Sequence, residues 1–247
     1  MKVHTLLFLA VALLAGSAQA AISVPSFFGN NMVLQREAPV PIWGTADPGE
    51  MVTVRFADQK ASAKADEEGN WRIELQPLKA SSETRALTLE SDKDRKKTVI
   101  ENVLVGDVWV GSGQSNMAGR VASYARNDET LAALVEKAPY PQIRLMQGGP
   151  KPTWNEASQQ AVNQFSALHF AFGECLQREL DVPLGLIVGA VGGTPSGSWI
   201  PPQTYADSKK CQAVLAEFAK TYDHDAVMKQ YQARLAAWEK QAEEAKA

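Results

Sequence analysis

A serine in a glycine-rich turn is the residue of this sequence best suited to covalent chemistry. Residues 111–117 read Gly-Ser-Gly-Gln-Ser-Asn-Met and follow an apolar run at 103–110 that predicts a buried strand. A turn that leaves a strand and opens a helix can hold a hydroxyl group exposed and rigid, as a nucleophile requires. Ser115 is therefore a candidate nucleophile. The alternative is that Ser115 only caps the following helix, because serine is favoured at helix N-caps.

A nucleophilic serine needs a general base, usually histidine, and the chain has three histidines. His4 lies in a predicted signal peptide. His169 falls among apolar residues of a predicted helix, which is typical of a structural histidine. His224 lies between Asp223 and Asp225, but residues adjacent in sequence do not face one another on a helix. We prefer a solvated helix start there and keep His224 as the alternative base.

The first 20 residues are predicted to be a signal peptide. Lys2 supplies a positive start, residues 6–15 are apolar, and residues 18–20 read Ala-Gln-Ala, a typical cleavage site. The apolar run is shorter than the about 20 residues that a transmembrane helix needs. We therefore expect an exported protein, periplasmic or secreted, that begins at Ala21 and has no membrane anchor.

The composition argues against several partners and leaves one disulfide open. A formal net charge of −3 gives no reason to expect nucleic acid or an anionic membrane as a partner. The sequence has no Walker loop and no metal-ligand motif, so we expect neither a metal ion nor another cofactor. Cys175 and Cys211 are the two cysteines. They either pair in an oxidising compartment, or Cys175 is a buried free thiol on an apolar helix face. The sequence does not indicate an oligomeric state.

The chain changes its pattern near residue 102. Residues 51–56 and 71–75 alternate between apolar and polar side chains, and turn residues stand at 47–49 and 68–70. Short alternating strands separated by turns predict a small antiparallel β-sandwich domain at residues 21–102.

Residues 103–247 alternate between apolar strands and amphipathic helices. Strands are predicted at 105–110, 143–146 and 184–191, and a short helix at 129–137. A long amphipathic helix is predicted from five apolar residues at three- and four-residue spacing, Phe165, Leu168, Phe172, Leu176 and Leu180. This α/β pattern favours a parallel sheet with helices on both faces. Because ligands bind beyond the carboxyl ends of such strands, we expect Ser115 and residues 192–194 to share one crevice.

The last 40 residues are predicted to be helical. Residues 208–247 are rich in Ala, Glu, Lys and Gln, and an apolar stripe is formed by Met228, Tyr231, Leu235 and Trp238. We interpret this stretch as a solvated amphipathic helix that docks on the domain. Because the sequence stops inside this helical composition without a cap or a final strand, we expect a sheet that is incomplete at its C-terminus.

Common serine-hydrolase motifs do not fit the turn around Ser115. Met117 occupies the place of the second glycine in the α/β-hydrolase motif G-x-S-x-G, and Ala118 occupies the place of the lysine in S-x-x-K. Three blocks of the sequence, one of which contains Ser115, resemble the sialate O-acetylesterase-like family of carbohydrate esterases and occur in the same order as in that family. They are residues 28–36 (FGNNMVLQR) with 39–44 (PVPIWG), residues 106–109 (GDVW) with 113–117 (GQSNM), and residues 192–195 (GGTP) with Trp199.

This resemblance implies an SGNH-type (GDSL-type), flavodoxin-like hydrolase domain at residues 103–247 behind the β-sandwich. It also implies a carbohydrate O-acetylesterase whose partner is an acetylated sugar or glycan, of the sialate type by family. Ser115 would attack the acetyl ester and form an acetyl-enzyme that water then hydrolyses. The backbone N–H groups of Ser115 and of Gly192 or Gly193 would form the oxyanion hole, since a developing oxyanion needs preorganised donors.

Four further residues are candidates for supporting roles. Gln114 and Asn116 would shape the oxyanion turn, although they could be simple turn residues. Thr194 would support the glycine turn. Trp199 would either line the crevice or anchor its own loop.

The sequence also departs from the family pattern. The family's third block, with an oxyanion asparagine, and its Asp-x-x-His block, with the general base, have no counterpart. Ser166 stands three residues before His169, and Thr221 stands three residues before His224. Val191 stands where relatives often carry an aromatic residue, which puts the substrate shape in question.

We therefore expect a fragment that is nearly inactive by itself. One alternative is a non-catalytic glycan-binding protein on the same scaffold. Another is a chain that assembles with a separately encoded carboxyl-terminal piece.

Overall fold

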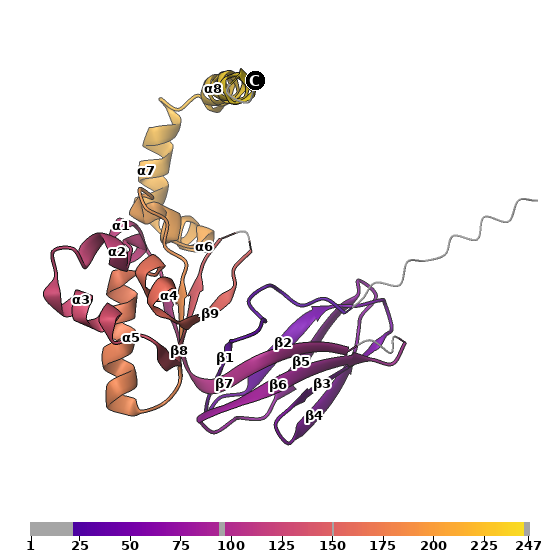
Figure 1. Cartoon of the computed structure of the whole chain (residues 1–247). Coiled ribbons are helices and arrows are strands. Elements are labelled where there is room, and N and C mark those ends of the chain that lie inside the picture. Colours follow the sequence, from indigo (N-terminus) through magenta and orange to yellow (C-terminus); the bar gives the residue numbers. More distant parts are fainter. Residues whose placement is uncertain (1–21, 94–96, 150, 245–247) are drawn as a thin grey trace, which may run out of the picture. The chain divides into compact units, whose positions relative to one another are not determined.

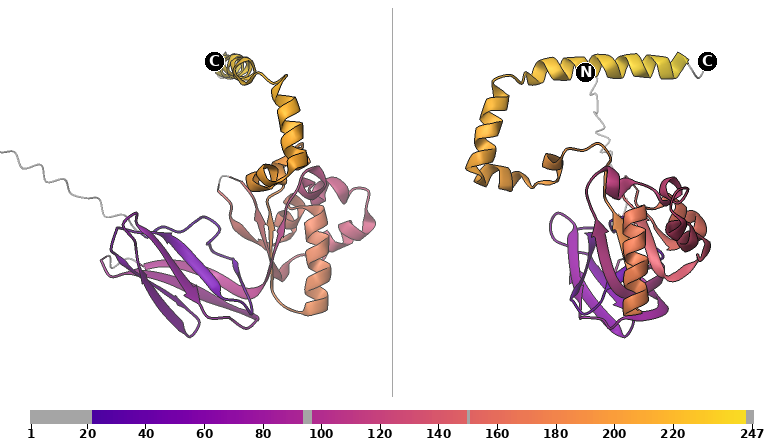
Figure 2. Two further views of the ribbon diagram at one scale, coloured as in Figure 1. Left: turned by 180° about the vertical axis from the view of Figure 1, so that it is seen from behind. Right: turned by 90° about the vertical axis from the view of Figure 1, so that its left-hand side faces the viewer.

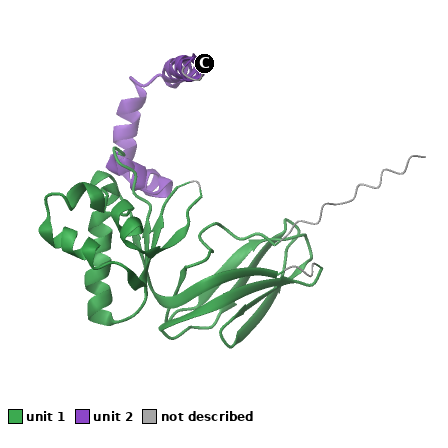
Figure 3. Ribbon diagram, viewed as in Figure 1, with its two compact units in different colours: residues 1–194 green, residues 195–247 purple. Residues whose placement is uncertain are grey.

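The computed structural model describes residues 22–93, 97–149 and 151–244 of the chain. The chain divides into two compact units, Met1–Thr194 and Pro195–Ala247 (Figure 3). The predicted signal peptide, residues 1–20, lies outside the described residues.

The N-terminal part of the first unit is built from two layers whose strands are antiparallel, except for the short strand β1 (Val33–Gln35). Its other strands are β2 (Val40–Thr45), β3 (Met51–Phe56), β4 (Gln59–Lys64), β5 (Asn70–Leu75), β6 (Ser81–Ser91) and β7 (Lys97–Gly111). β2 and β5 form a two-stranded sheet, while β4, β3, β6 and β7 are neighbours in a larger one (Figure 1). Every second side chain of β3 and β5 is buried, as at Val54 and Ile73. The alternation predicted for these two strands is confirmed.

β7 joins these layers to the second part of the unit. It pairs antiparallel with β6 as far as Val105, and from Asp107 to Gly111 it pairs parallel with β10 (Leu184–Val188). β1 pairs parallel with β7 at Leu104–Gly106. Residue 102, where we expected a domain boundary, therefore lies inside one continuous strand of one compact unit.

The second part of the unit holds three parallel strands, which are β8 (Tyr140–Gln147), β10 and the end of β7. β8 and β10 are parallel neighbours, and β9 (Trp154–Ala157) adds an antiparallel edge, so the sheet is mixed. The order β7-β10-β8 places the first, third and second parallel strands of the chain side by side. A flavodoxin-like sheet would place the first strand between the other two. This part of our expectation is wrong for the described strands.

The helices of the first unit cover one face of this sheet. They are α1 (Ser115–Ala118), α2 (Val121–Tyr124), α3 (Glu129–Glu136), α4 (Gln159–Gln164) and α5 (Ala167–Leu180). In β10, Leu184 and Leu186 pack with the helices, whereas Ile187 packs with the N-terminal layers. Figure 2 shows the helices and the N-terminal layers on opposite sides of the sheet. Our expectation of helices on both faces is wrong for this unit, because N-terminal side chains cover the second face.

α5 buries a different face from the one its spacing predicts. Leu168 and Phe172 are 55% and 42% exposed, whereas Phe170 is fully buried. A Cβ atom at Gly173 would lie 2.3 Å from Cδ1 of Leu186. Glycine at this position therefore lets the helix backbone approach β10 closely, and this contact selects the buried face.

The second unit consists of helices. They are the 3₁₀ helix η1 (Ser196–Trp199), α6 (Pro202–Asp207), α7 (Lys209–Ala219) and α8 (His224–Glu244). No described residue of α8 is buried, and Tyr231 and Trp238 of the predicted stripe are exposed. Docking of this helix on a domain stays a prediction. Among the described residues, no strand follows β10.

Candidate active site

Ser115 lies just beyond the carboxyl end of β7, at the first residue of α1. Gly113 adopts a φ of 127°, a conformation that favours glycine, and it turns the chain into the helix. Gln114 is the N-cap residue, and its carbonyl oxygen accepts the first helical hydrogen bond, from the N–H of Ala118 at 2.9 Å. Ser115 is exposed. Since Gln114 occupies the N-cap, capping does not account for the serine.

The glycine turn at residues 192–193 meets the serine turn. Val188, the last residue of β10, pairs with Gly111, the last residue of β7. Backbone hydrogen bonds continue past both strand ends, from Gly189 N–H to the Gly111 carbonyl (2.9 Å) and from Val191 N–H to the Gly113 carbonyl (3.0 Å). The structure therefore brings together the two turns that the sequence placed in one crevice.

The first glycine of this pair stands closest to the nucleophile candidate. A Cβ atom at Gly192 would lie 4.0 Å from Cα of Ser115. Gly193 has a φ of 80°. Thr194 donates its hydroxyl to the Val191 carbonyl at 2.8 Å, which closes the turn. Because glycine has no side chain, this turn can approach Ser115 closely, as an oxyanion hole built from backbone N–H groups would require.

The three remaining candidates have different surroundings. Oε1 of Gln114 lies 3.4 Å from Oγ of Ser115. Asn116 lines a hollow of about 410 Å³ together with Leu131 of α3 and Leu168 of α5. Trp199 belongs to the second unit, where it ends η1.

His169 lies beneath the serine turn and is a structural histidine, as its apolar neighbours predict. Its side chain is buried, and Nε2 lies 3.2 Å from the carbonyl oxygen of Trp109. Because a carbonyl only accepts hydrogen bonds, Nε2 carries the proton. The ring lies 6.0 Å from both Phe165 and Phe172. Burial lowers the pKa of His169, so the imidazole is neutral near pH 7.

His224 begins α8 in the second unit and is exposed. Its Nδ1 atom lies 3.3 Å from the hydroxyl of Tyr222. Oδ1 of Asp223 accepts the N–H of Ala226 at 3.0 Å, so this carboxylate caps the helix. These contacts agree with the solvated helix start that we preferred.

A polar clamp at the base of the site was missed by the sequence analysis. Nε and Nη2 of Arg36 donate to the two carboxylate oxygens of Asp107 at 2.9 and 3.1 Å, which raises the pKa of Arg36. Oε1 of Gln35 accepts the N–H of Val108 at 2.9 Å. The clamp ties β1 to the half of β7 that leads to Ser115. The sequence could have indicated this clamp, because Arg36 and Asp107 belong to two of the blocks that carry the family resemblance.

Both cysteines are free thiols in the structure. Cys175 is exposed, so the alternative of a buried thiol is wrong, because α5 buries its opposite face. Within residues 22–93, 97–149 and 151–244, no three His, Cys, Asp or Glu side chains are grouped to hold a metal ion. No helix of that described part has the length and apolar character needed to cross a membrane.

The sequence of this chain matches a protein family over more than half of its length. The family described as carbohydrate esterase, sialic acid-specific acetylesterase, matches residues 105–236. This range contains Ser115 and the glycine turn. The chain belongs to this family. The resemblance drawn from its sequence blocks is confirmed.

Named relatives agree with membership of this family. The sialate O-acetylesterases of Homo sapiens and Pongo abelii are each 29% identical over 209 residues, covering 74% of this chain and 39% of theirs. The sialate O-acetylesterase of Mus musculus is 26% identical over 228 residues. The chain spans about two fifths of the length of these relatives.

A solved structure supports the mixed α/β fold. The crystal structure of a carbohydrate acetylesterase from Xanthomonas citri matches with a TM-score of 0.70 and 25% sequence identity. The match covers 77% of this chain and 45% of that chain. The expectation of an α/β protein is therefore confirmed in its coarser form.

Proposed function

We propose that this chain carries the nucleophile and part of the oxyanion hole of a carbohydrate O-acetylesterase. Its substrate would be an acetyl ester on a sugar, of the sialate type by family. One observation carries the proposal: Ser115 and Gly192 adjoin at the ends of two neighbouring parallel strands. This is where open α/β sheets bind ligands.

The proposed reaction has two steps. Oγ of Ser115 attacks the acetyl carbonyl carbon while a general base takes the hydroxyl proton, and the oxyanion accepts hydrogen bonds from the backbone N–H groups of Ser115 and of Gly192 or Gly193. Collapse of the tetrahedral intermediate breaks the bond between the acetyl carbon and the sugar oxygen, which takes the proton from the base and leaves as a hydroxyl, so that an acetyl-enzyme remains. Water then releases acetate and restores the hydroxyl. Each oxyanion donor contributes about 3–4 kcal/mol in comparable enzymes.

The general base is the weakest part of the site in this chain. Nε2 of His169 is engaged with the Trp109 carbonyl, and neither His169 nor His224 belongs to an Asp-x-x-His block. Removing the histidine of the subtilisin triad costs about a millionfold in turnover. We therefore expect this chain alone to be nearly inactive, with the family's Asp-x-x-His supplied by residues that this chain lacks. His224 remains the alternative base within the chain.

Hydrolysis of 4-nitrophenyl acetate tests this proposal. We would compare the purified chain with Ser115→Ala, and with Ser112→Ala as a matched exposed serine in the same turn. We expect only a small serine-dependent rate, present in Ser112→Ala and absent in Ser115→Ala. Adding a polypeptide that carries the family's Asp-x-x-His block should raise the rate by orders of magnitude. Equal rates in Ser115→Ala and the parent, even with that block present, would reject Ser115 as the nucleophile.

A non-catalytic glycan-binding protein is the second candidate. The engaged Nε2 of His169 favours it, because the histidine beneath the turn cannot accept a proton at that atom. This candidate predicts saturable binding of an acetylated sugar that survives Ser115→Ala. It also predicts no acetate release after the missing block is restored, which is the opposite of the first candidate.

We also propose the finer organisation that the resemblance implies. Residues 21–102 would be a β-sandwich domain and residues 103–247 an SGNH-type domain in an exported protein, periplasmic or secreted. The antiparallel layers, the apolar start and the Ala-Gln-Ala site support this proposal. Mass spectrometry of the exported protein should find Ala21 as the first residue, and retention of residues 1–20 would contradict processing.

A further inference from the structure

A second hollow lies on the first unit, beside the edge strand β9. Its volume is about 730 Å³, within the range of small-molecule sites. We name it the amide hollow after the side chains that line it, which include Asn31, Arg120, Gln147, Asn155, Glu156 and Gln164. Amide groups both donate and accept hydrogen bonds, as sugar hydroxyl groups do. This lining therefore suits a polyhydroxylated ligand.

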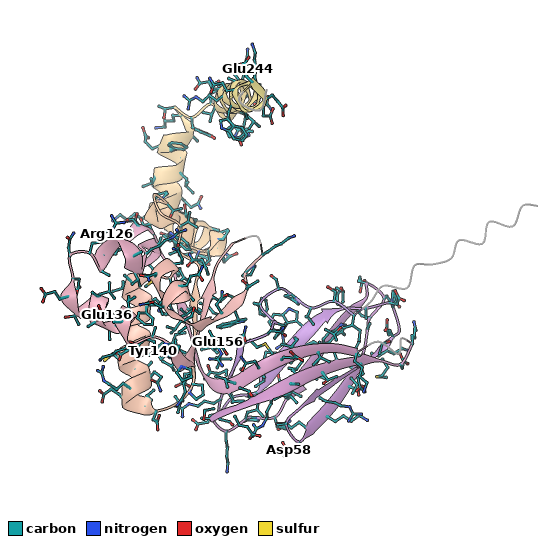
Figure 4. All side chains as sticks on the ribbon, viewed as in Figure 1. Asp58, Arg126, Glu136, Tyr140, Glu156 and Glu244 are labelled. Carbon is teal, nitrogen blue, oxygen red and sulfur yellow. The ribbon has the colours of Figure 1, made fainter. Side chains whose placement is uncertain are left out.

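One wall of the amide hollow is held in place by a buried guanidinium. Arg144 is 2% exposed, and its Nη2 lies 3.3 Å from Oδ1 of Asn102 and 3.6 Å from Oε1 of Glu156. Nδ2 of Asn102 lies 2.7 Å from Oδ1 of Asn31 and 2.7 Å from Oε1 of Glu156. Figure 4 labels Glu156 where the sheet adjoins the N-terminal layers. Asn31 and Glu156 line the hollow, and these contacts already hold their side chains in place. Binding of a ligand would therefore cost little free energy for ordering these two side chains.

Unusual backbone geometry accompanies this network. Asn31 and Asn102 have φ angles of 68° and 57°. Left-handed conformations are uncommon for residues other than glycine, although asparagine adopts them more readily than most residues do. In both residues this conformation accompanies a side-chain amide that joins the network.

The opposite wall connects the amide hollow to the serine turn. Nη1 of Arg120 donates to Oε1 of Gln164 at 2.9 Å. Arg120 follows α1, the helix that Ser115 opens, by two residues. Arg120 thus links the segment that follows α1 to α4, whose residues line the hollow.

The strand register gives the spacing between β7, which leads to Ser115, and β8, whose last residue lines the amide hollow. Gly111 pairs with Val188, and Val188 pairs with Gln147, so the three residues form one row across β7, β10 and β8. Two strand spacings amount to about 10 Å. Ser115 follows the first member of this row by four residues, and Gln147 lines the hollow. Ser115 therefore lies within four residues of a strand end that stands about 10 Å from the strand lining the hollow, a spacing on the scale of a short oligosaccharide.

We propose that the amide hollow is a subsite for an unacetylated sugar unit of the glycan whose acetyl ester lies at Ser115. The proposal rests on the proposed function for the position of the ester, and its ligand chemistry is that of sugar hydroxyl groups. Vicinal hydroxyls would bind the carboxylate of Glu156 and the amides of Asn31 and Gln164. Arg120 would add a donor pair for a hydroxyl or for the carboxylate of an acidic sugar.

NMR titration of the ¹⁵N-labelled chain with unacetylated sugars tests the subsite. The probes are 3′-sialyllactose, which carries a carboxylate, and xylotetraose, which is neutral. Side-chain amide signals of Asn31, Gln147, Asn155 and Gln164 should shift in a saturable manner with at least one probe, and the responding probe distinguishes an acidic from a neutral glycan. No shift of these signals with either probe at millimolar concentration would overturn the proposal.

Variants separate the amide hollow from general surface binding. Glu156→Gln and Gln164→Ala should each weaken probe binding roughly tenfold, because the first replaces a charged acceptor with a neutral amide and the second removes an amide that binds a sugar hydroxyl. Gln232→Ala, an exposed amide on α8, is the matched control and should bind as the parent does. The backbone spectrum of each variant reports whether it is folded. Folded hollow variants that bind as tightly as the control would overturn the proposal.

Failure of the subsite is distinguishable from failure of the proposed function. The probes carry no ester, so their binding is independent of acetyl transfer and should persist in Ser115→Ala. Ser115-dependent hydrolysis of 4-nitrophenyl acetate without probe binding would reject the subsite alone. Probe binding at the hollow without Ser115-dependent hydrolysis, even with the Asp-x-x-His block present, would reject the proposed nucleophile while keeping the sugar site.

Discussion

At the scale of single residues, the turn around Ser115 packs on a buried histidine. His169 packs between Phe165 and Phe172, and its Nε2 is held by the Trp109 carbonyl. A Cβ atom at Gly111 would lie 3.1 Å from the His169 ring and 2.9 Å from Sδ of Met117. The imidazole therefore fills the space beneath the turn, and glycine at the end of β7 makes room for it.

The buried imidazole should make stability depend on pH. Burial lowers the pKa of His169, so the unfolded chain, with a histidine pKa of about 6.5, binds this proton more readily than the folded chain does. The stabilisation is complete above pH about 6.5 and declines as the pH falls from there toward the lowered pKa. Urea unfolding between neutral and mildly acidic pH should show this decline in the parent.

Two variants assign this pH dependence. His169→Gln should flatten the decline, whereas His224→Gln, at an exposed histidine, should leave it as in the parent. An unchanged slope in His169→Gln would show that other groups cause the acid dependence.

At the scale of elements, β7 positions the nucleophile candidate because three different strands hold it. β6 pairs with the first part of β7 and β10 with its last part. β1 pairs with β7 where the first part ends and the last part begins. The clamp of Arg36 and Asp107 fixes β1 at the point where β7 passes from the antiparallel layers into the parallel sheet. The side chains are 23% and 16% exposed, so water screens the pair only in part.

Breaking the clamp should lower the stability of this junction. Because the pair is bidentate and half-buried, we expect Arg36→Ala and Asp107→Ala each to cost about 1–3 kcal/mol of unfolding free energy. The double variant should reveal a coupling of about 0.5–3 kcal/mol. Urea unfolding of the four proteins completes this cycle. Arg55→Ala, which removes a more exposed ion pair with Glu90, serves as the control and should cost less than about 1 kcal/mol. Additive effects would show that the two side chains stabilise the junction independently.

At the scale of the whole molecule, the described hydrophobic core belongs to the first unit. The two clusters of buried apolar side chains contain residues only up to Val188, and the partly buried residues packed against them end at Ala190. The exposed apolar side chains of α7 and α8, such as Phe218 and Trp238, contribute to neither cluster. Folding of the first unit should therefore not require the second.

Truncation after Thr194 tests this independence. Calorimetry of residues 21–194 should show a cooperative transition at nearly the same temperature as that of residues 21–247, since no core contact is removed. Loss of the cooperative transition would mean that α6–α8 support the first unit. A truncation after Leu180, which removes β10 between two parallel neighbours, is the control and should not fold.

Much of the local structure could be predicted from sequence because it depends on neighbours along the chain. The period-two pattern predicted β3 and β5, and apolar runs predicted the strands that became parts of β7, β8 and β10. The position of Ser115 and of residues 192–194 just past predicted parallel strands predicted that the two turns meet. The alternation and the meeting of the turns follow from strand pleating and from the shared edge of parallel strands, which hold in most sheets of this kind.

The sequence alone determined the strand pattern, the serine turn and the family. Only the tertiary structure decided the strand order, the layer that covers the second face of the sheet and the buried face of α5. The physical reason is that these features depend on contacts between distant segments. α5 has apolar residues on more than one side, so spacing fits two faces equally, and the approach of Gly173 to Leu186 selects one. The network of Arg144, Asn102 and Glu156 is likewise assembled from separate strands, and no local pattern indicates it.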